Sequence, residues 1–149
     1  TTLNVNAKYF GPITYEEKEL IHIDNGLIGF ESYIDYLPIP FQEGDDSMIS
    51  LQCLEDEDLS FILMNPFGIY PDYAPELSEQ DLRDLGAESI NDISYYVISV
   101  IRETVAQSTV NLKAPLAVNA INRRAKQIIL DQTEYTFRHA LGDMVHKED

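Results

Sequence analysis

Residues 48–65 read MISLQCLEDEDLSFILMN, and this stretch decides the fold class. Residues 48–54 alternate apolar and polar side chains, which indicates a half-buried β-strand. Residues 59–64 are apolar at nearly every position, and the spacer 55–58 between the two runs is wholly acidic. A spacer this short cannot hold a crossover helix. The two runs are therefore predicted to be antiparallel strands joined by a hairpin.

The same short β-like pattern recurs along the chain. Further runs span 3–9, 19–23, 36–41, 95–101, 109–112, 116–121 and 127–130, and Gly11-Pro12 ends the first of them. We expect a mainly β, single-domain fold: an antiparallel β-barrel-like fold with one or two short helices. A β-sandwich is the alternative architecture. Residues 1–141 form this domain in the prediction, and residues 142–149 form a polar C-terminal tail that frays.

One helix is signalled clearly. Ser78 can accept a hydrogen bond as N-cap, Asp81 stands at the reciprocal position of a capping box, and Gly86 can end the helix. We expect this helix over 79–85. The preceding segment 65–75 carries three prolines and is predicted to be a rigid, ordered loop. Its aromatic residues Phe67, Tyr70 and Tyr73 either plug one end of the barrel or form a preorganised docking surface.

Acidic residues dominate the first two thirds of the chain. The sequence has 149 residues and a formal net charge of −16, and residues 1–99 hold 20 acids against 3 bases. Residues 100–149 are nearly neutral, with 6 acids and 7 bases. The excess is either a solubility device or a field directed at a basic partner. Direct contact with nucleic acid is disfavoured, because binding to phosphates relies on lysine and arginine.

No motif in the sequence carries catalysis or metal binding. The three histidines, His22, His139 and His146, are far apart, and we interpret His22 as a structural residue within a strand. Cys53 is the only cysteine and is expected to be a buried apolar residue. We therefore expect a protein that is not an enzyme and has no metal or cofactor. A buried cluster of carboxylates facing a cavity would reopen that question.

Three further segments are interpreted as turns. Residues 26–30, GLIGF, lack the full signature of a phosphate-binding loop. Residues 55–58 lack the ligand spacing of a calcium loop and are taken as solvated hairpin acids. Residues 123–126, RRAK, fall between two expected strands and are predicted to form a hairpin turn.

Five stretches together resemble the flagellar assembly factor FliW family across essentially the whole chain. They are KYFG at 8–11, GLIGF at 26–30, FILMNPF at 61–67 followed by PDY at 71–73, TVNLKAP at 109–115, and KQIIL at 126–130. One departure is Ile28, which replaces the proline that the family usually has in this turn.

The resemblance implies a cytoplasmic, non-enzymatic regulator with a β-barrel-like fold. Members of the family bind the translational repressor CsrA away from its RNA surface and so relieve repression of flagellin synthesis. They also bind flagellin, which couples flagellin level to its own synthesis. The sequence has no run of about 18 apolar residues and no basic-then-apolar leader, so we expect neither a membrane partner nor export.

Two groups of residues are candidates for partner binding. The first group, where the stiff aromatic loop meets the acidic part of the chain, contains Tyr70, Asp72, Tyr73 and Glu76. The second group matches a family motif and either braces that loop at a barrel corner or touches flagellin; it contains Asn111, Leu112, Ala114 and Pro115. Two other functions stay open: an acidic nucleic-acid mimic that occupies a basic groove, and a flagellin export chaperone without a regulatory role.

Overall fold

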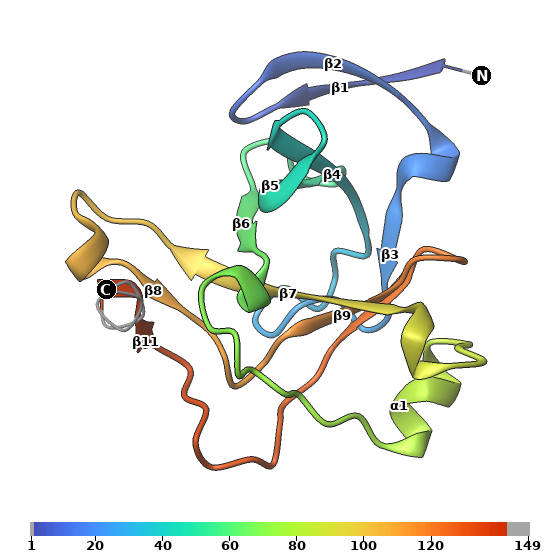
Figure 1. Cartoon of the computed structure of the whole chain (residues 1–149). Coiled ribbons are helices and arrows are strands. Elements are labelled where there is room, and N and C mark those ends of the chain that lie inside the picture. The colour runs from blue at the N-terminus through green and yellow to red at the C-terminus, as the bar shows by residue number, and fades with distance from the viewer. Residues whose placement is uncertain (1, 143–149) are drawn as a thin grey trace.

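Seven strands pair in a closed ring in the computed structural model, which describes residues 2–142 (Figure 1). In ring order they are β3 (Ile21–Ile23), β4 (Asp35–Gln42), β5 (Asp45–Cys53), β6 (Ser60–Met64), β7 (Ile93–Val100), β9 (Leu116–Asn119) and β10 (Arg124–Gln127). Among the described strands, only the pairing of β10 with β3 is parallel, and it closes the ring. The predicted antiparallel barrel is confirmed, with this one parallel joint.

The remaining elements lie around the barrel. β1 (Thr2–Ala7) and β2 (Gly11–Glu16) form a separate hairpin, which Figure 1 shows at one end of the barrel, and β8 (Thr109–Val110) and β11 (His139–Ala140) extend the sheet beyond β7. One α-helix lies wholly within the described residues, α1 (Glu79–Asp84), together with four short 3-10 turns: η1 (Glu17–Glu19), η2 (Pro66–Gly68), η3 (Ile90–Asp92) and η4 (Val105–Gln107). The helix predicted at 79–85 is confirmed.

Two apolar layers form the main core. Inside the barrel, side chains from facing strands meet, with Leu51 of β5 and Leu63 of β6 almost fully buried beside Cys53. Outside the barrel wall, a second layer lies between β7 and the segments that cross it, and includes Val97 and Leu112. The alternation along β7 explains both layers, because successive side chains point to opposite faces of a strand. Cys53 is buried, as predicted.

The prediction for residues 123–130 is wrong in its boundaries. Only Arg123 lies in the turn, where it has a left-handed backbone with φ 67° and its N–H donates to the Asn119 carbonyl at 2.9 Å. Arg124–Gln127 is strand β10, and the residues 128–130 that were expected to be a strand lie beyond it. The pattern misled because Ala125 is the only buried residue of this strand, and its charged neighbours are partly exposed.

The N-terminal hairpin was also missed. Gly11-Pro12, predicted to end a strand, instead begins β2, and Gly11 adopts φ 69° so that the chain reverses at once. Glycine tolerates this left-handed conformation without steric cost. The first strand accordingly ends at Ala7 rather than at Tyr9.

Residues 26–30 form a turn, as predicted, and Gly26 and Gly29 both have positive φ. The acids at 55–58 form the β5–β6 connection, but they are not merely solvated. Glu57 Oε2 accepts a hydrogen bond from the Asn6 N–H at 2.7 Å, and Glu55 Oε1 accepts one from the Asp35 N–H at 3.1 Å. Of the predicted tail 142–149, all residues but Gly142 lie outside the described residues.

Candidate functional site

The candidate site is residues 65–78, called here the aromatic loop, which leaves β6 and leads into α1. Asn65 Oδ1 accepts a hydrogen bond from the Phe67 N–H at 3.0 Å, and Pro66 follows at the first position of η2. The Tyr70 N–H then donates to the Pro66 carbonyl at 2.8 Å, and the Tyr73 N–H donates to the Tyr70 carbonyl at 2.9 Å. Successive local turns therefore fix the loop backbone, and the prolines limit its alternatives.

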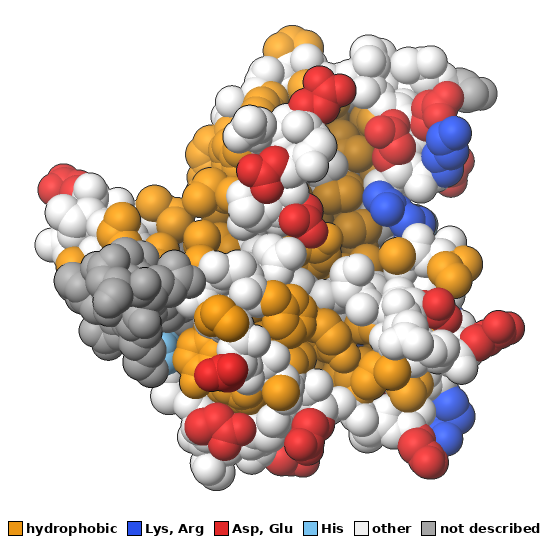
Figure 2. All heavy atoms as spheres, in the orientation of Figure 1, with side chains coloured by type: hydrophobic (Ala, Val, Ile, Leu, Met, Phe, Trp, Pro, Cys, Tyr) orange, Lys and Arg blue, Asp and Glu red, His pale blue; other side chains and the backbone are white. Residues whose placement is uncertain are grey.

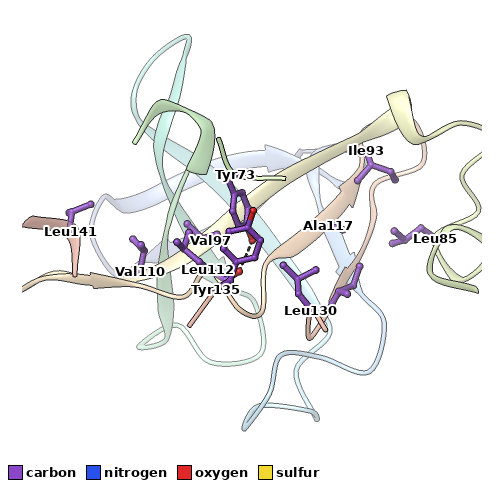
Figure 3. Close-up of a cluster of buried hydrophobic side chains, with 11 residues drawn as sticks. Tyr73, Leu85, Ile93, Val97, Val110, Leu112, Ala117, Leu130, Tyr135 and Leu141 are labelled. Atoms are coloured by element: carbon purple, nitrogen blue, oxygen red, sulfur yellow. Dashed lines mark hydrogen bonds between the residues drawn. The ribbon is translucent and has the colours of Figure 1, made fainter. Parts of the chain in front are cut away.

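Tyr73 anchors the aromatic loop in the outer core layer. Its side chain is only 3% exposed, and its hydroxyl donates to the Leu112 carbonyl at 2.7 Å (Figure 3). The rings of Tyr73 and Tyr135 pack edge to face with centroids 4.7 Å apart. The Tyr135 hydroxyl in turn accepts a hydrogen bond from the Ala74 N–H at 2.9 Å. Burial raises the pKa of Tyr73, so this hydroxyl keeps its proton as a donor.

Gln132 holds the second half of the loop. Its side-chain oxygen accepts from the Glu76 N–H at 3.1 Å, and its side-chain nitrogen donates to the Ala74 carbonyl at 2.8 Å. The Lys113 ammonium donates to the Gln132 carbonyl at 2.8 Å and so fixes Gln132 itself. The backbone of the aromatic loop is therefore bound to the chain around residues 112–113 and 132–135.

A charged clamp fixes the helix that follows the loop. Ser78 and Asp81 form the predicted capping box, and the Lys126 ammonium of β10 contacts Asp81 at 2.9 Å and Asp84 at 2.8 Å. Burial opposes ionisation of Asp81, yet hydrogen bonds from Ser78 and Lys126 outweigh burial and lower the pKa of Asp81. The hydrogen bond from Lys126 lowers the pKa of Asp84, and that same bond raises the pKa of Lys126.

The first group of predicted site residues divides between surface and core. Asp72 and Glu76 are exposed on the aromatic loop, and Tyr70 is half-buried with its ring against those of Tyr73 and Tyr135. Tyr73 is buried, so its side chain supports the loop rather than forming a contact surface. Phe67, 41% exposed, is the aromatic ring that the loop presents most openly.

The second group of predicted site residues braces the loop. Leu112, Ala114 and Pro115 are buried, so their side chains cannot touch a partner in this structure. Asn111 Oδ1 accepts a hydrogen bond from the Ala114 N–H at 2.9 Å and closes the corner after β8. These residues therefore lie at the corner after β8, where the Leu112 carbonyl holds Tyr73 of the aromatic loop, and contact of this group with flagellin stays a prediction.

Sequence reasoning missed the braces supplied by Lys113, Gln132 and Tyr135. All three act through contacts far away in the sequence, and the stretch 131–138 has no apolar periodicity that would mark it as structural. The available signal is the aromatic pair Tyr135 and Phe137 in an otherwise polar stretch, and of these two residues only Tyr135 is buried.

The surface around the loop is acidic and partly apolar. Figure 2 shows orange apolar side chains across the middle of one face, with red acidic side chains around them and few blue ones. His22 bonds to Asp35 within the barrel wall, as expected of a structural histidine. Residues 2–142 contain no group of three or more acidic, histidine or cysteine side chains placed to hold a metal ion. In that same range, no helix is long and apolar enough to cross a bilayer.

These features define a class: small, acidic, single-domain β-barrel proteins with a braced aromatic loop on the barrel wall. The sequence model of the FliW protein family matches residues 4–141. A flagellar assembly factor FliW from Caldanaerobacter subterraneus subsp. tengcongensis is 37% identical over 139 residues, covering 93% of each chain. One from Shouchella clausii is 35% identical over 136 residues, covering 91% of this chain and 92% of the relative. The chain therefore belongs to the FliW family of flagellar assembly factors.

A solved structure agrees with this assignment. The crystal structure of a flagellar assembly factor FliW superposes with a TM-score of 0.86 and 29% sequence identity, covering 93% of this chain and 96% of that one. The likeness extends over the barrel as a whole and is not confined to a local motif.

Proposed function

We propose that this flagellar assembly factor works in the cytoplasm as a protein antagonist. It binds the translational repressor CsrA and relieves repression of flagellin mRNA translation. It also binds flagellin, so that flagellin level controls how much antagonist is free. The observation that carries this proposal is the braced aromatic loop, which presents Asp72 and Glu76 to solvent on a backbone fixed from both sides. A preordered acidic surface loses little entropy when it docks on a basic protein.

The net charge of −16 supports a remote mode of action. An acidic body docked beside an RNA-binding surface lowers the local affinity for phosphate, even where it does not cover that surface. Because the chain has 10 lysines and arginines against 26 acids, its net charge repels phosphates, and the antagonist itself does not compete for RNA. The antagonist therefore lowers the RNA affinity of the repressor by electrostatic repulsion of the RNA phosphates, together with any change in the shape of the repressor.

A charge-reversal experiment tests the loop surface. Asp72→Lys with Glu76→Lys reverses two exposed charges without touching a brace, and we expect repressor affinity to fall by about tenfold or more. The matched control is Glu17→Lys with Asp58→Lys, which reverses two exposed acids elsewhere on the molecule. Isothermal titration of purified CsrA gives both affinities. Equal affinities for the two folded variants contradict the loop assignment.

A second experiment separates the antagonist from its two alternatives. A remote binder forms at least a transient ternary complex with repressor and labelled RNA, whereas a nucleic-acid mimic and RNA exclude each other. An export chaperone binds flagellin and leaves repressor–RNA affinity unchanged. Capture from cell extract of neither CsrA nor flagellin overturns the proposal as a whole.

A further inference from the structure

One end of the barrel opens into a pocket of about 360 Å³. Its floor is apolar and includes Ile49, Leu63 and Val118 from three different strands, and Tyr96 and Arg123 lie among its polar residues. Figure 2 shows the molecule hollowed between its upper and lower parts, with apolar atoms at the bottom. A volume of this size and an apolar floor suit one large apolar side chain together with its main chain.

A second, smaller cavity of about 190 Å³ continues from this pocket along β7. The two cavities share Asp46, Ser94 and Tyr96, so they form one groove. The smaller cavity ends at Asn65 and Phe67 of the aromatic loop. We call the joined cavities the β7 groove.

The β7 groove exists because β6 is shorter than β7. Strands β8 and β9 lie along β7 on the side away from β6. The Ala120 N–H, just after β9, donates to the Asp92 carbonyl, and the Asn111 N–H, just after β8, donates to the Ile98 carbonyl. The even-numbered residues of β7 therefore direct their backbone groups toward β8 and β9, away from β6. Odd-numbered residues direct theirs toward β6, which pairs only with residues 97–99. The N–H and C=O of Tyr95 therefore point to a place where no strand lies.

The residue that would lie opposite Tyr95 explains this gap. Met64 of β6 lies opposite Val97 of β7, and the two strands are antiparallel. If β6 continued by two more residues, Pro66 would lie opposite Tyr95. Proline has no N–H to donate and begins η2, so the chain turns away from the sheet. A part of β7 that has no strand partner on this side is therefore left beside the groove, and an unpaired strand edge next to a pocket is the combination that peptide-binding sheets use.

The charges at the groove favour a basic occupant. Asp45 and Asp46, the first two residues of β5, are exposed at the edge of the groove. A third acid, Glu43, precedes them in the β4–β5 turn. Arg123 also lines the pocket; one of its guanidinium nitrogens donates to the Glu19 carbonyl at 2.6 Å, and its buried Nε has no partner among the described residues, so the three acids outnumber this one cation. Burial raises the pKa of the Tyr96 phenol, and the negative charge of Asp46 raises that pKa further. The positive charge of Arg123 lowers it, so both charged side chains act on the Tyr96 phenol. No hydrogen bond joins its hydroxyl to another described residue, so it can bond to an occupant.

We propose that the β7 groove binds an extended peptide segment of a partner protein, with a large apolar residue followed by lysine or arginine. The segment adds as a short strand beside Tyr95, its apolar side chain enters the barrel mouth over Leu63, and its cation lies at Asp46. The groove ends on the aromatic loop at Asn65 and Phe67 but does not include Asp72 or Glu76, so substitutions at those two acids test the two proposals separately.

The test uses the synthetic peptide Ac-TKVLKVT-amide and the full chain labelled with 15N. We expect amide shifts centred on residues 93–96 and a Kd below about 1 mM. The same peptide with serine in place of leucine loses the anchor, and one with proline in place of the second valine loses strand pairing; both should bind at least about tenfold more weakly.

Two variants of the protein localise the binding. Ala120→Trp fills the mouth from an exposed position, and Asp46→Lys reverses the charge at the edge. Each should weaken peptide binding by about tenfold or more, whereas the matched controls Thr14→Trp and Glu17→Lys should not. Asp72→Lys with Glu76→Lys should keep peptide binding, which separates failure here from failure of the proposed function.

Three results overturn the proposal. One is the absence of binding at 1 mM peptide in the folded wild-type chain. Another is equal binding by the groove variants and their controls. The third is a concentration-dependent dimer that Ala120→Trp abolishes, because that would assign the groove to a second copy of the chain.

Discussion

The Tyr73 hydroxyl donates a 2.7 Å hydrogen bond to the Leu112 carbonyl, and this bond fastens the aromatic loop to the corner that follows β8. Both residues are buried, so no water replaces the bond when it is lost. The two groups of residues singled out in the sequence therefore meet in space. One presents the surface, and the other holds it in place.

Removing that hydroxyl should destabilise the protein. Tyr73→Phe keeps the ring in its packing but leaves the Leu112 carbonyl unpaired, and we expect a loss of about 1–3 kcal/mol in the free energy of unfolding. Urea denaturation measures the change. The control Tyr9→Phe removes a hydroxyl from a residue that is 46% exposed and should change stability little. Equal effects of the two substitutions would argue against the brace.

The clamp on α1 should be measurable in the same way. Lys126→Met keeps the aliphatic stem and removes the ammonium that contacts Asp81. Both side chains are largely buried, so we expect a loss of about 1 kcal/mol, the upper end for an ion pair of this kind. Lys18→Met, which breaks a pair whose lysine side chain is 81% exposed, serves as the control and should have no measurable effect.

The pH dependence of the clamp follows from the direction of its pKa shifts. The lowered pKa values of Asp81 and Asp84 contribute stability above their unfolded pKa, about 4, which is lost as pH falls through the folded values. The raised pKa of Lys126 contributes stability below about pH 10, which is lost as pH rises through its folded value. The stability difference between wild type and Lys126→Met should therefore be flat between those limits and shrink outside them. A difference that grows in acid would contradict the clamp.

The turn at residues 26–30 should distinguish two glycines that look equivalent in the sequence. Gly26→Ala combines φ 66° with a Cβ placed 2.6 Å from the Phe30 carbonyl oxygen, so we expect a loss of about 2 kcal/mol or more. Gly29→Ala meets no atom within 4 Å, so only the cost of its positive φ remains, about 1 kcal/mol. Thermal unfolding of both variants checks the order, and a reversed order would show that the turn differs from this description.

Antagonism through the net charge should fade with salt. At 0.1 M salt the screening length is about 10 Å, and at 1 M it is about 3 Å. We expect RNA affinity of the repressor–antagonist complex to approach that of free repressor as salt rises, after correction for the salt dependence of free repressor. A fluorescence anisotropy titration with labelled RNA measures both. Inhibition that is unchanged across the titration would leave shape change as the only mechanism.

Local signals in the sequence predicted their elements well. The capping box of Ser78 and Asp81 uses residues within one turn, so the helix could be placed from sequence alone. The hairpin around residues 55–58 was equally clear, because a short spacer admits only one kind of connection. These elements depend on no distant part of the chain.

Non-local contacts account for the errors. Gly11 and Arg123 both reverse the chain through positive φ, and the sequence does not show where an arginine will adopt that conformation. The bond from the Glu76 N–H to Gln132 joins residues 56 positions apart, and no periodicity marks such a pair. The surface loop could be predicted, but the braces that make it rigid could not.

The parallel joint between β3 and β10 bears on how the molecule is made. The His22 N–H donates to the Arg123 carbonyl at 3.0 Å, so β3, which pairs with β4 on one side, gains its second partner only after almost the whole domain has been synthesised. Until then the nascent chain carries an unpaired strand edge, which is prone to join the wrong partner. A chain that stops before β10 cannot close its barrel, so barrel closure is a late event in the synthesis of this domain.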